Sequence, residues 1–90
     1  MIQLEELKSK LLELKPQIDD YRSAIGMDDL LKKQQQLEGE TADLNFWDDL
    51  ENSSKVLQQI SQIKAKAATY TKMESDYEDL ITLIEIAMEE

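Results

Sequence analysis

Apolar residues at alternating spacings of three and four run through the first 25 residues and limit what this chain can fold into. The members of this seam are Leu4, Leu7, Leu11, Leu14, Ile18, Tyr21 and Ile25. Such spacing places every member on one side of an α-helix, whereas a strand would alternate at every second residue. The segment is therefore predicted to be a helix that packs lengthwise against another helix.

Pro16 lies inside this helix, on the side opposite the seam. Because the apolar phase is the same before and after it, we expect a kink at the proline rather than the end of the helix. Gly26 is expected to close the helix, since glycine readily takes the left-handed conformation common at helix C-termini.

A second helix is predicted from a weaker seam, formed by Leu30, Gln34, Leu37, Thr41 and Leu44. Asp28 or Asp29 is expected to cap its N-terminus, because a carboxylate can accept hydrogen bonds from free backbone amides there. Gly39 lies inside and costs about 1 kcal/mol relative to alanine. This helix is therefore expected to be the least stable.

A third helix is predicted from about residue 49 to 89, with a bend near residue 70 as the alternative to an unbroken rod. Its seam keeps one phase through Val56, Ile60, Ile63, Ala67, Tyr70, Glu74, Tyr77, Ile81, Ile84 and Met88. A bend is considered because Thr69 and Thr71 are β-branched and lower helix propensity. The fold class is thus all-α: an antiparallel, coiled-coil-like bundle of three helices, the third long, forming a single domain over residues 1–90.

The apolar residues between Leu80 and Met88 cover roughly 220° of the third helix, whereas packing against one neighbour needs a stripe of only about 100°. We therefore expect something outside these helices to cover part of that face.

Charge narrows the range of partners. The formal net charge is −10, from 20 acidic and 10 basic residues, and no basic residue follows Lys72. Such a surface repels a phosphate backbone and anionic membranes and favours basic protein partners. The sequence also has no cysteine, no signal-peptide pattern and no apolar run of the about 20 residues that span a bilayer. A cytoplasmic protein is expected.

Catalytic chemistry is not predicted. Histidine and cysteine are absent, and the two glycines stand alone, so the usual general base, thiolate nucleophile and phosphate-binding loop are missing. We therefore expect no catalytic residue, no cofactor, no metal site and no enzyme activity. Asp48 and Asp49 could ligate a hard cation, but the calcium-loop spacing is missing. They are interpreted as turn and helix-cap residues.

Phe46 and Trp47 are the only phenylalanine and the only tryptophan. Two interpretations stay open for them. They could seal the corner where the second and third helices meet, or they could anchor a partner, since tryptophan is enriched in interface hot spots. Together with Asp48 and Asp49 they are the candidate partner-contact residues. The lysines likewise allow two interpretations, helix-pairing charges or a local basic contact patch that could touch RNA.

The order of these features resembles the N-terminal domain of the bacterial peptide chain release factor 2 family, whose members are class-I release factors. The resemblance covers essentially all 90 residues and is carried by Phe46-Trp47-Asp48-Asp49, with Glu51 shortly after, and by the closing run from Leu80 to Glu89. Two departures concern the turn. The family tends to have proline three residues before and after the tryptophan, where this chain has Leu44 and Leu50.

The resemblance implies a role in translation termination at UGA and UAA codons. The family's Ser-Pro-Phe and Gly-Gly-Gln motifs are absent from these residues, so no catalytic residue is carried over and no sequence-specific reading of nucleic acid is expected. The implied partners are the GTPase-associated region of the large ribosomal subunit, the class-II release factor GTPase and the remaining domains of the same protein, with no membrane. In the family a further helix follows this segment, which would cover the wide apolar face. The alternative is a coiled-coil scaffold or adaptor that works by dimerising.

Overall fold

The computed structural model describes residues 2–90, which are helical almost throughout and contain no strand. The helices are α1 (Ile2–Leu12), α2 (Lys15–Ala24), α3 (Met27–Thr41), a short 3-10 helix η1 (Phe46–Asp48) and α4 (Leu50–Glu89). The predicted all-α fold with a long final helix is confirmed. None of the helices among the described residues combines the length and apolar character needed to cross a membrane.

The chain forms two compact units. Unit 1 comprises Met1–Ala24 and Tyr70–Glu90, and unit 2 comprises Ile25–Thr69. The long helix α4 contributes its second half to unit 1 and its first half to unit 2. Its helical conformation continues through Thr69 and Thr71, so the prediction of one long helix is confirmed. The Thr69 hydroxyl donates to the Ala65 carbonyl at 3.1 Å and so stays within the helix's own hydrogen bonding.

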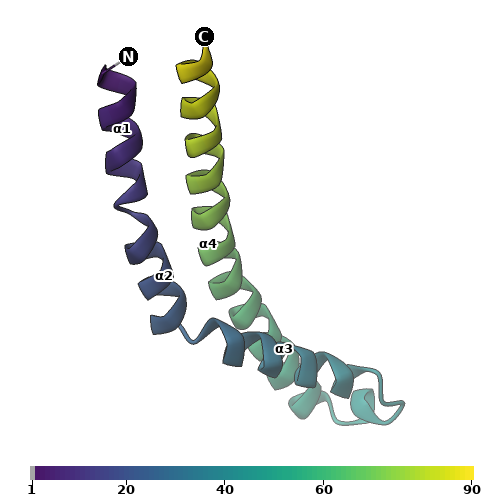
Figure 1. The fold of residues 1–90 in the computed structure, drawn as a ribbon. Helices are drawn as coiled ribbons and strands as arrows, with labels where there is room; N and C mark the ends of the chain where they lie inside the picture. Colours follow the sequence, from purple (N-terminus) through teal and green to yellow (C-terminus); the bar gives the residue numbers. More distant parts are fainter. Residues whose placement is uncertain (1) are drawn as a thin grey trace. The chain divides into compact units, whose positions relative to one another are not determined.

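In unit 1, α1 and α2 lie antiparallel to the second half of α4, so that the start of α1 lies beside the end of α4 (Figure 1). The expected kink at Pro16 is present as a two-residue interruption at Glu13 and Leu14. Helical hydrogen bonding bridges it, because the Leu14 amide donates to Leu11 at 3.0 Å and the Leu14 carbonyl accepts from Ile18 at 2.9 Å. Proline has no amide hydrogen and its ring crowds the preceding turn, which explains the interruption.

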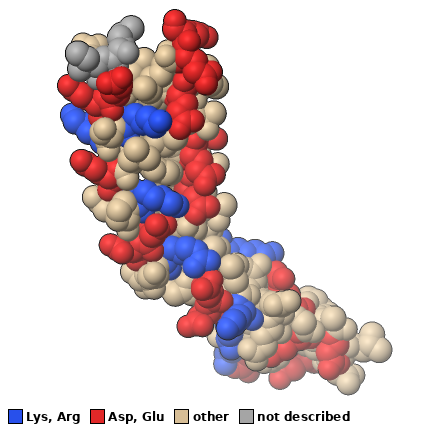
Figure 2. Space-filling view, in the orientation of Figure 1, with Lys and Arg blue, Asp and Glu red and all other residues tan. Residues whose placement is uncertain are grey.

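Contacts of basic side chains on α1 and α2 show the register of unit 1. Lys8 pairs with Glu85 at 3.4 Å. The Lys15 ammonium lies 5.9 Å from the centre of the Tyr77 ring, and Arg22 lies 5.9 Å from that of Tyr70. The three basic residues are thus seven residues apart along α1 and α2. Their partners on α4 follow in the opposite direction, seven or eight residues apart. In Figure 2, basic side chains over α1 and α2 lie beside a column of acidic side chains over the second half of α4.

Unit 2 packs α3 and η1 against the first half of α4. Its core is formed by Leu37, Phe46, Val56, Ile60 and Ile63, with Leu30 packed against it. Burial of such side chains stabilises by about 1.5–3 kcal/mol each. Lys64 of α4 pairs with Glu38 of α3 at 3.5 Å on the surface beside this core.

The two ends of α3 differ from the sequence prediction. Its N-cap is Gly26, with a left-handed φ of 64°, so neither Asp28 nor Asp29 is the cap. Both lie in the first turn, where a carboxylate still favours the positive end of the helix dipole. The same conformation of Gly26 agrees with its predicted place at the end of the preceding helix.

The C-terminal end of α3 also falls earlier than its seam predicted. The helix stops at Thr41, whose hydroxyl donates to the Glu38 carbonyl at 2.7 Å. Leu44 therefore lies beyond the helix, and its predicted seam position is wrong.

Candidate docking surface

The segment between α3 and α4, residues 42–49, is a fixed turn whose shape comes from short-range hydrogen bonds. Asp43 Oδ1 accepts from the Asn45 amide at 2.8 Å. The amides of Phe46 and Asp48 donate to the carbonyls of Asp43 and Asn45, each at 3.1 Å. These three-residue turns build η1 and hold the chain in one conformation before α4 begins.

Phe46 and Trp47 lie in η1 but have different surroundings. Phe46 is 7% exposed and belongs to the core of unit 2. Trp47 is 52% exposed, and its ring meets the Phe46 ring edge-on, with centroids 4.8 Å apart and planes at 86°. Phe46 therefore closes the corner, whereas about half of the Trp47 side chain is exposed to solvent.

Two leucines extend the apolar surface of this turn. Leu44 is 92% exposed and Leu50 is 75% exposed, so both present most of their surface to solvent. They occupy the positions where the release factor family was expected to have proline. Sequence reasoning singled them out as departures but did not predict them as surface residues. The available signal was their position among turn formers, since Asp43, Asn45 and Asp49 favour chain reversal over helix.

Asp48 and Asp49 are both exposed. Asp49 Oδ1 accepts from the Asn52 amide at 3.2 Å, which is the geometry of a helix N-cap for α4. The predicted role of Asp49 as a cap residue thus has a structural basis. Among residues 2–90 the structure shows no group of three or more histidine, cysteine, aspartate or glutamate side chains that could hold a metal ion.

The turn sits in a strongly acidic stretch. Between Lys33 and Lys55 the sequence contains no basic residue but six acidic ones, Glu38, Glu40, Asp43, Asp48, Asp49 and Glu51. In the view of Figure 2, acidic and uncharged atoms occupy this end of unit 2. The exposed apolar side chains thus lie within an acidic stretch of the sequence.

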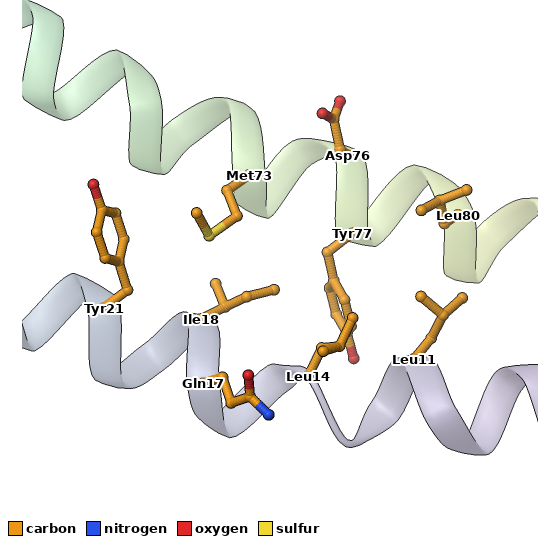
Figure 3. A pocket seen from close by; sticks show the side chains of 9 residues that line it. All are labelled: Leu11, Leu14, Gln17, Ile18, Tyr21, Met73, Asp76, Tyr77 and Leu80. Atoms are coloured by element: carbon orange, nitrogen blue, oxygen red, sulfur yellow. The ribbon is translucent and has the colours of Figure 1, made fainter.

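A second apolar surface lies in unit 1. A groove of about 450 Å³ runs between α1–α2 and α4 and is lined by Leu11, Leu14, Gln17, Ile18, Tyr21, Met73, Asp76, Tyr77 and Leu80 (Figure 3). Further along α4, Leu83 and Ile86 are each exposed by half or more. The sequence predicted that the apolar face of α4 is wider than one neighbouring helix can cover. The exposed apolar residues here agree with that prediction.

One polar pair interrupts the α4 seam in unit 1. The hydroxyl of Tyr70, a buried residue, donates to Glu74 Oε2. This hydrogen bond and, after it, burial raise the pKa of the Tyr70 hydroxyl above its usual range. Ion pairing acts similarly on two lysines. Hydrogen bonds to Asp19 and Asp76 raise the pKa of Lys15 and Lys72, respectively.

These features define a class of protein: an acidic, all-α protein with two exposed apolar surfaces. The comparisons with known proteins then point to one family. The chain is 29% identical over 89 residues to a peptide chain release factor 2 of Lactiplantibacillus plantarum, covering 99% of this chain and 24% of that protein. It is 30% identical over 90 residues to that of Clostridium perfringens, covering 100% and 24%.

The peptide chain release factor 2 of Acholeplasma laidlawii is 32% identical over 82 residues, covering 90% of this chain and 22% of that protein. The chain thus spans about a quarter of the length of the curated relatives it matches. No family model and no solved structure matches it. The resemblance seen in the sequence is confirmed, because at least 90% of the chain matches a segment of each of these proteins named peptide chain release factor 2.

Proposed function

We propose that this chain is the ribosome-docking segment of a cytoplasmic translation-termination factor that acts at UGA and UAA codons. The observation that carries the proposal is the match of the whole chain to a quarter of proteins named peptide chain release factor 2. Stop-codon reading and peptide release are assigned to the other three quarters. In this proposal the segment recognises a surface and performs no chemistry.

The proposed docking target is the GTPase-associated region of the large ribosomal subunit, and the segment also communicates with the class-II release factor GTPase. Two observations favour protein contacts over tight binding of a nucleic-acid strand. The net charge is −10. In addition, several lysines already pair with carboxylates of the chain itself, namely Lys8, Lys15, Lys55, Lys64 and Lys72.

A chimeric release factor tests this proposal. The chain replaces the matching segment of the Clostridium perfringens protein, and a second version lacks the segment. We expect the chimera to bind ribosomes paused at UGA or UAA more tightly than the shortened protein, and to cross-link to the GTPase-associated region. Equal ribosome affinity of the two versions would remove the support for a docking role.

A dimerising coiled-coil scaffold is the second candidate, and the groove in unit 1 favours it. An open apolar groove flanked by helices is a surface on which another helix can pack. Sedimentation equilibrium of the 90-residue chain separates the two candidates. A monomer supports the docking segment, whereas a tight dimer that Leu80→Glu disrupts supports the scaffold.

A further inference from the structure

We propose that Leu44, Trp47 and Leu50 form an apolar anchor that inserts into an apolar pocket of a protein partner whose rim carries lysine and arginine. The inference rests on the proposed function, because it looks for this partner on the ribosome. It goes further by naming the contacting side chains and the chemistry of the surface that receives them.

Exposed apolar residues lie close together in the sequence of this turn. Single exposed leucines are normal on protein surfaces, but grouped ones mark interaction sites. Here three large apolar side chains occur within seven residues, with exposures of 92% for Leu44, 52% for Trp47 and 75% for Leu50. Leu44 lies inside the turn that the Phe46 amide closes onto the Asp43 carbonyl, and Trp47 follows in η1, so both belong to the same hydrogen-bonded segment.

Hydrogen bonds and packing against the core hold the turn in place without a partner. Asp43 and Asp49 hold it through hydrogen bonds to the amides of Asn45 and Asn52. The neighbouring Phe46 fixes it to the core of unit 2, and Trp47 packs edge-on against that ring. An anchor that is ordered before binding loses less conformational freedom when the complex forms. Tryptophan in such a setting is the side chain most enriched in interface hot spots.

Charge decides between a protein and an RNA partner. Six acidic residues and no basic residue lie between Lys33 and Lys55. Lys64 and Lys55 pair with two of them, Glu38 and Glu51, and the remaining acidic excess would repel a phosphate backbone near the anchor. A pocket rimmed with lysine and arginine would instead be attracted, which raises the association rate and excludes acidic partners. A second copy of this chain is disfavoured for the same reason, because its own turn carries the same negative charge.

The experiment combines binding with cross-linking, using purified large ribosomal subunits as the probe and the chimeric release factor as the protein. The test variant carries Leu44→Ser, Trp47→Ala and Leu50→Ser. The matched control carries Leu12→Ser and Leu57→Ser, which remove leucines that are also exposed but lie in α1 and in the body of α4. Circular dichroism melting of both variants shows whether the helices are intact.

We expect the test variant to bind at least tenfold more weakly and the control to bind like the unchanged chimera. A photoreactive amino acid in place of Trp47 should form a cross-link that protease removes and ribonuclease leaves intact. If the chimera binds and the test variant binds equally well, the anchor is wrong while the docking role stands. A cross-link that ribonuclease removes also overturns it. If the chimera itself binds no better than the shortened factor, the proposed function fails and the anchor with it.

Discussion

The hydroxyl of Tyr70 donates a hydrogen bond to Glu74, one turn further along α4. Both residues lie on the α4 seam, and Glu74 is the only polar residue on that seam between Val56 and Met88. A carboxylate at such a position is costly unless a donor satisfies it. The pair therefore makes a polar layer tolerable in a seam that is otherwise apolar.

Tyr70→Phe should make the free energy of unfolding of unit 1 less sensitive to high pH. The pKa of Tyr70 is raised in the folded state, so its contribution to stability is complete below pH about 10, the usual pKa of tyrosine. The contribution is lost as pH rises from there through the folded pKa. Urea unfolding at pH about 8 and about 11 should show a steeper fall for the natural chain than for Tyr70→Phe. Tyr21→Phe is the control, and parallel losses for the natural chain and Tyr70→Phe would contradict the prediction.

Leu37→Ala should destabilise the chain by about 2–5 kcal/mol, because it opens a cavity in the core of unit 2. Leu31→Ala is the matched control on the same helix, since Leu31 is exposed, and it should cost less than about 1 kcal/mol. The free energy of unfolding in urea, measured by circular dichroism, checks both. Equal costs would mean that Leu37 is not a core residue.

The two glycines should respond to alanine in opposite directions. Gly26→Ala should destabilise by about 1 kcal/mol or more, because φ is 64° and an L-residue is strained there. Gly39→Ala should stabilise by about 0.5–1 kcal/mol, because Gly39 is inside α3 and a Cβ there would meet no atom within 4 Å. Thermal melting separates the two variants, and a shift of the same sign for both would refute the argument.

Asp49→Ala should weaken the start of α4 by about 0.5–2 kcal/mol, since it removes the cap hydrogen bond to the Asn52 amide. Asp48→Ala, one residue earlier and outside the cap position, serves as the control and should change stability less. Amide hydrogen exchange at Glu51 and Asn52 gives a local measurement. Unchanged exchange there would show that the carboxylate of Asp49 does not hold the helix terminus.

The α4 seam could be predicted from sequence because its spacing is regular over a long distance. Every seam position from Val56 to Met88 is buried or half-buried, including Glu74. The seam of the first 25 residues predicts burial less accurately. Ile18 is buried, but Leu7 and Leu14 are each more than two-fifths exposed, because unit 1 has a helix on one side of them only. Periodicity identifies which residues share a helix side, but it does not say how much of that side a partner covers.

The docking surface was predicted only in part. Composition pointed to Trp47 as a candidate contact, whereas Leu44 was assigned to a seam. The spacing of Leu37, Thr41 and Leu44 fits a helix that in fact ends at Thr41. Local hydrogen bonds at Thr41 and Asp43 end it, and their competition with the helix cannot be judged from periodicity.

The two units also differ in how their parts are distributed along the chain. Unit 2 is one continuous stretch, Ile25–Thr69, whereas unit 1 joins Met1–Ala24 to Tyr70–Glu90. Synthesis proceeds from the N-terminus, so α1 and α2 leave the ribosome well before their packing partner exists. The residues of α1 and α2 therefore wait for the second half of α4 before they reach their native contacts, whereas unit 2 needs no residue beyond Thr69.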